Sequence, residues 1–166
     1  MDIENLSTKV VALKMKGEWV ALKNVMESIF LEKGIVEIVA ELANRLPNST
    51  FEIFFLNGLL HMSQLNACQF KRLFSLLSDK PLGLYNLERL LVGYGGITRK
   101  DFHEMAGNLD YKETCVVDGE RTTENNVPVR IMTHDEYVKM MCMRYEIPID
   151  TVVAFRKNLK SVLQFY

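Results

Sequence analysis

The last third of the chain holds the pattern that most restricts the fold. Residues 134–160 contain two amphipathic segments separated by a short connection at 146–150. Apolar residues recur at three- and four-residue steps on each side of it, which places them along one face of a helix. A connection this short makes the two helices neighbours in space. The spacing resembles a helix-turn-helix unit, so we expect a C-terminal helical pair that docks on another molecule.

Methionine and aromatic side chains gather around this pair. Four methionines lie between residues 132 and 143, more than one helix face can bury. Core filling would account for some of them, but methionine and aromatic side chains are also enriched at the centres of protein interfaces. We therefore predict a protein-binding surface. Its residues are Tyr137, Met140, Met143, Phe165 and Tyr166.

A helix-turn-helix unit suggests nucleic acid as the alternative partner, because its second helix can enter the major groove. Between residues 139 and 160 there are five basic against two acidic side chains, which would attract phosphates. However, the first turns of the second helix, from Ile149 to Ala154, are mainly apolar and include Asp150, a poor set for reading bases. The alternative hypothesis is a nucleic-acid-binding regulator. Its contacts would be Arg144, Thr151, Arg156, Lys157 and Lys160.

Helical spacing also dominates residues 1–110. Gly17 and Gly34 stand where the first two helices should end, since glycine readily adopts a left-handed terminal conformation. Thr98 and Asp101 have the spacing of a capping box, in which side chains and backbone amides at a helix start bond reciprocally. These signals predict a compact helical body.

Punctuation inside this body is less simple. Pro81 and Gly83 predict a chain break before a short helix over 85–92. The glycines within 93–96 predict a flexible joint at the end of that helix. The competing interpretation is an anion cradle, because basic residues and a helix start follow, although the dinucleotide and P-loop patterns are both incomplete.

The periodicity changes over residues 111–132. Residues 114–117 are apolar and β-branched, and Asp118–Gly119 and Asn125–Asn126 are turn signals. We expect a small antiparallel β meander here. The predicted fold is therefore α+β and predominantly helical, as one domain over 1–166. It comprises a helical body (1–110), the meander (111–132) and the C-terminal helical pair (133–166).

Composition limits the function. The formal charge is −1, so no global field attracts nucleic acid or an anionic membrane. Three separated cysteines encode neither a disulfide framework nor a zinc knuckle, which favours a reducing compartment. Neither a leader pattern nor an apolar run long enough to cross a bilayer is present in the sequence. We expect a cytoplasmic protein that does not enter membranes.

No catalytic, metal or cofactor pattern is found. His103 lies close in sequence to Asp101 and Glu104, but adjacent helical residues point in different directions. An enzyme would require a pocket that joins His103 or His61 to carboxylates from elsewhere in the chain. The sequence thus predicts a small intracellular, non-enzymatic regulatory or adaptor protein that binds a protein partner and no cofactor. Two heptad-like steps near the N-terminus leave a homodimer as a further assembly.

Overall fold

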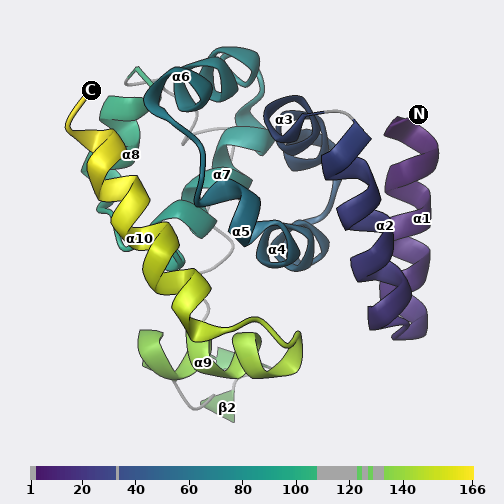
Figure 1. Ribbon diagram of the computed structural model, residues 1–166. Helices are drawn as coiled ribbons and strands as arrows, with labels where there is room; N and C mark the ends of the chain where they lie inside the picture. Colours follow the sequence, from purple (N-terminus) through teal and green to yellow (C-terminus); the bar gives the residue numbers. More distant parts are fainter. Residues whose placement is uncertain (1–2, 33, 108–122, 125–126, 129–132) are drawn as a thin grey trace.

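The fold is all-α. The computed structural model describes residues 3–32, 34–107, 123–124, 127–128 and 133–166 (Figure 1). The helices are α1 (Ile3–Lys16), α2 (Trp19–Glu32), α3 (Ile35–Arg45), α4 (Asn48–Asn57), α5 (Leu59–Met62), α6 (Ala67–Leu76), α7 (Pro81–Gly93), α8 (Arg99–Met105), α9 (His134–Arg144) and α10 (Ile149–Leu163).

The prediction of an α+β fold with a β meander is wrong. Of the segment 111–132, only two dipeptides are described, β1 (Thr123–Glu124) and β2 (Val127–Pro128), which pair antiparallel. The predicted strand at 114–117 and the turn at 118–119 lie outside the described residues. Two-residue strands are too short to form a sheet that could cover the body. The buried hydrophobic core identified in the described chain comes from helices and their short connections.

The core lies where α3, α4, α6 and α7 meet. In Figure 1, α1 and α2 run side by side at one edge, and α10 crosses the opposite side with α9 at its foot. Helix α3 packs on α7 and α6, while α10 packs on α5. Asn86 of α7 is buried, and its side-chain amide donates to the carbonyl of Ala43 at 2.6 Å, which fixes α7 against the end of α3.

The helix ends follow local sequence signals. Gly17 and Gly34 have φ values of 70° and 62°, so glycine stands at both positions where the backbone takes a positive φ. The capping box of Thr98 and Asp101 is also confirmed. A second capping box, which the sequence reading missed, begins α6 with Asn66 and Gln69.

The predicted break before the helix over 85–92 lies earlier than expected, because α6 ends at Leu76 and both Pro81 and Gly83 already belong to α7. Pro81 is the first residue of α7, a position where proline's missing amide hydrogen is not needed. Gly83 lies inside α7. A Cβ at this position would come 2.7 Å from Leu77 Cδ2, so the absence of a side chain leaves room for Leu77. Its small size serves the contact between α7 and the preceding turn, so the glycine does not mark a break.

Candidate functional site

The turn between α9 and α10 sets the geometry of the C-terminal pair. Glu146 has φ of 56°, and the amide of Ile147 donates to the carbonyl of Cys142 at 2.8 Å. These features form a Schellman motif, in which glycine usually holds the left-handed position. Pro148 then precedes α10. The two predicted helices are therefore confirmed, and in Figure 1 they lie at an angle to each other.

The inner face of α10 is fixed to the body by apolar packing. Its buried residues are Val152, Phe155, Leu159 and Val162. The rings of Phe155 and Phe55 meet edge to face at 5.6 Å between centroids. Gly95 is buried beneath Leu159, since a Cβ on Gly95 would lie closer than 3.0 Å to Leu159 Cδ2. The segment 93–96 thus provides a close packing surface for α10, with Gly95 against Leu159.

The inner side of α9 is fixed by a shared carboxylate. The hydroxyls of Tyr94 and Tyr137 both donate to Glu52 Oε2, at 2.7 and 2.6 Å. Burial raises the pKa of Tyr94, and the charge and hydrogen bond of Glu52 raise it further. Burial likewise raises the pKa of Tyr137, with the Glu52 hydrogen bond as the next cause. Both phenols therefore remain protonated donors at neutral pH.

The five residues of the predicted protein-binding surface lie in different environments. Tyr137 points inward to Glu52, and Met140 is half-buried against the core. Met143 is 82% exposed and Phe165 is 67% exposed. Tyr166 is exposed, with Lys71 Nζ 5.3 Å from its ring centroid. The structure thus leaves Met143, Phe165 and Tyr166 accessible and does not gather the five into one patch.

The predicted nucleic-acid contacts are also divided. Arg144, Lys157 and Lys160 are exposed, while Thr151 is half-buried. Arg156 is half-buried, and its Nε donates to the carbonyl of Tyr94 at 3.0 Å. One guanidinium nitrogen is therefore committed to holding α10 on the glycine joint.

An exposed line of side chains follows the outer side of α10. We call Ile149, Val153, Lys157 and Lys160 the outer stripe. They recur at four, four and three residues, which places them on one helix face, roughly opposite the buried residues. Ile149 is 46% exposed and Val153 is 57% exposed. Sequence reasoning treated these two only as poor base-reading residues and missed them as a contact surface, although their i, i+4 spacing could have shown it.

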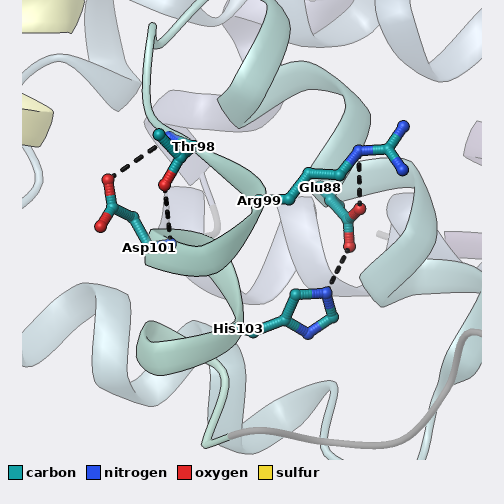
Figure 2. A network of polar contacts seen from close by, with 5 residues as sticks. All are labelled: Glu88, Thr98, Arg99, Asp101 and His103. Carbon is teal, nitrogen blue, oxygen red and sulfur yellow. Dashed lines mark hydrogen bonds and ion pairs between the residues drawn. The ribbon is translucent and has the colours of Figure 1, made fainter.

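Figure 2 shows a polar network at the start of α8. Glu88 of α7 is buried, with Arg99 Nε at 3.7 Å and His103 Nε2 at 3.6 Å from its carboxylate oxygens. Asp101, which the sequence placed near His103, instead caps the helix with Thr98. The network joins α7 to α8. Across the described residues, no three His, Cys, Asp or Glu side chains form a group that could hold a metal ion.

His61 shares a hollow with a carboxylate. The hollow has a volume of about 350 Å³, and its polar lining includes Glu37, His61, Gln64 and Gln69. Arg72 Nε donates to Glu37 Oε1 at 2.8 Å, and this hydrogen bond holds the pKa of Glu37 below its usual value. A carboxylate stabilised in its charged form is a weak general base. The arrangement therefore gives little support to acid–base catalysis.

The cysteines differ from one another. Cys142 is buried, and burial raises the pKa of its thiol, which makes it a poor nucleophile. Cys68, by contrast, is exposed on α6. Cys115 lies outside the described residues.

Comparison with family models, curated proteins and solved structures finds no match to this chain. None of the helices in the described parts of the chain is long and apolar enough to span a membrane.

Proposed function

We propose that this protein is a non-enzymatic regulatory or adaptor protein of the cytoplasm that binds a protein partner through the outer side of α9 and α10. The observation that carries the proposal is the exposure of Met143, Ile149 and Val153 at the connection between the helices. Apolar side chains gathered on a rigid helical surface mark binding sites more often than isolated ones do.

Nucleic acid is the second candidate, and the placement of Arg156 weakens it. Its bond to the Tyr94 carbonyl keeps this guanidinium close to the body. The exposed positions in the first turns of α10 are Ile149, Asp150, Val153 and Ala154, which offer three apolar contacts and a negative charge where base readout would occur. Lys157 and Lys160 remain available for phosphates, so the candidate keeps a specific test.

Differential capture tests the proposal. The chain of 166 residues is used to recover bound protein and nucleic acid from cells that produce it, and both are identified. Val153→Asp should abolish recovery of the protein partner because it places a charge in the apolar contact. The matched control is Val20→Asp on α2, which alters a valine that is 75% exposed and should leave recovery unchanged. Thermal unfolding of both variants checks that the fold is intact.

Charge reversal separates the two candidates. If nucleic acid is the ligand, Lys157→Glu with Lys160→Glu should remove it, and binding should weaken steeply with salt. Recovery of the same proteins by Val153→Asp and by the unaltered chain would contradict the proposed function.

A further inference from the structure

The outer stripe changes character along its length. Ile149 and Val153 make it apolar over the first turns of α10, and Lys157 and Lys160 make it basic over the last. Ile149 and Lys160 lie eleven residues apart, which is about 16.5 Å along the helix at 1.5 Å per residue. A partner that follows the stripe would thus meet an apolar half and a cationic half.

The apolar half is small. Burial of one large aliphatic side chain contributes roughly 1.5–3 kcal/mol at roughly 25 cal/mol per Å², which corresponds to about 60–120 Å² of apolar surface. Met143, Ile149 and Val153 are partly to largely exposed, so together they offer on the order of 200 Å². A stable association between globular proteins buries about 800 Å² on each partner. The patch is therefore too small to hold a second copy of this chain by itself, and its size suits a single helical segment.

The basic half is not neutralised from within α10. Asp150 is the one acidic residue of this helix, and it lies in the first turn, away from the two lysines. Among the described residues, neither Lys157 nor Lys160 takes part in a salt bridge. Exposed cations next to an apolar contact favour a partner with carboxylates at the matching position, because like charges there would oppose association.

Building on the proposed protein-binding function, we infer that the partner contributes an amphipathic helical segment that is apolar over about two turns and acidic over the next two. Its apolar turns pack on Ile149 and Val153, and its carboxylates meet Lys157 and Lys160. Helix-to-helix docking of this kind reads apolar anchors at i, i+3, i+4 and i+7.

Synthetic peptides test the inference on the full chain. Three labelled helical peptides share the same apolar positions and carry glutamate, lysine or glutamine at the flanking polar positions, and binding is followed by fluorescence anisotropy. At low salt the affinity of the glutamate peptide should be about tenfold higher than that of the glutamine peptide, or more, and the lysine peptide should have the lowest affinity. The preference should shrink as salt is added.

Matched variants locate the contact. Val153→Asp should abolish binding of the glutamate peptide, whereas Val20→Asp should not change it. Lys157→Glu with Lys160→Glu should remove the preference for glutamate, and Lys9→Glu with Lys23→Glu should keep it, since these lysines are exposed on α1 and α2.

The outcomes separate this inference from the function beneath it. Equal binding of all three peptides, still lost in Val153→Asp, would overturn the acidic partner while leaving protein binding through the stripe intact. Self-association of the unaltered chain that Val153→Asp abolishes would identify a second copy as the occupant and overturn the inference. Binding of none of the peptides would also overturn it, and the proposed function would then depend on the capture experiment alone.

Discussion

Gly95→Ala tests the seating of α10, on which the geometry of the outer stripe depends. A Cβ at this position would lie closer than 3.0 Å to both Leu91 O and Leu159 Cδ2. Leu159 could relieve one contact by leaving its rotamer, at about 0.5–1.5 kcal/mol. The carbonyl of Leu91 belongs to α7 and can move only with the backbone. Overpacking of this kind costs typically 1–3 kcal/mol, and two simultaneous contacts place the expected loss of unfolding free energy near the upper end, at about 2–3 kcal/mol.

The measurement is urea unfolding followed by circular dichroism, with Gly93→Ala as the control. A Cβ on Gly93 would meet its nearest neighbour, His134 Cε1, at an ordinary 3.8 Å. Alanine at a compatible site stabilises by roughly 0.4–1 kcal/mol because it restricts the unfolded chain. The two variants should therefore shift the midpoint in opposite directions. Unfolding of Gly95→Ala at the same urea concentration as the unaltered protein would show that α10 does not pack closely on Gly95.

Three further predictions concern the turn, the shared carboxylate and the body. Glu146→Gly should raise the unfolding free energy by roughly 0.5–1 kcal/mol, because glycine relieves the strain of the left-handed backbone but also has more freedom in the unfolded chain. An unchanged or lower free energy in urea unfolding would count against a left-handed residue at this position. Because the pKa values of Tyr94 and Tyr137 are raised above the ordinary 10.0, their stabilising contribution is present below pH 10 and is lost above it as the unfolded phenols ionise. Tyr137→Phe should reduce the alkaline loss of stability, and an identical pH profile would contradict this. Glu37 has a lowered pKa, so its ion pair with Arg72 stabilises the fold above pH 4.5, the ordinary pKa, and this stabilisation is lost as the pH falls through the lowered pKa. Glu37→Gln should reduce the unfolding free energy by only a few tenths of a kcal/mol at neutral pH, since both side chains are half exposed, and should not change it in strong acid.

Local signals in the sequence were sufficient for much of the helical architecture. Gly17 ends α1 and Thr98 begins α8 because both depend on atoms within a few residues. The helices of the C-terminal pair follow from apolar periodicity alone. The meander was mispredicted because strands, unlike these helix ends, are not determined by atoms within a few residues. Strand propensity depends on the partners that a segment finds in three dimensions, and β-branched residues and turn signals do not supply them.

Long-range contacts were not predictable from the sequence. Tyr137 was assigned to a binding surface because aromatic residues favour interfaces, yet its hydroxyl reaches Glu52, 85 residues earlier in the chain. Gly83 was taken as a break because nothing nearby indicates that Leu77 lies against it. His103 was compared with its neighbours in sequence, whereas its acidic partner is Glu88 on another helix. In each case the deciding atom belongs to another turn or helix.

Contacts between distant residues also change how the charge of the C-terminal pair bears on function. Counting residues from 139 to 160 gives five basic against two acidic side chains and favours phosphate. Packing then commits the Arg156 Nε to the Tyr94 carbonyl, while the apolar side chains of Ile149 and Val153 remain on the surface. The outer side is therefore less basic and more apolar than the sequence alone indicates. Because binding depends on exposed groups and not on composition, this difference supports a protein partner over nucleic acid, and Val153→Asp compared with Lys157→Glu and Lys160→Glu tests it.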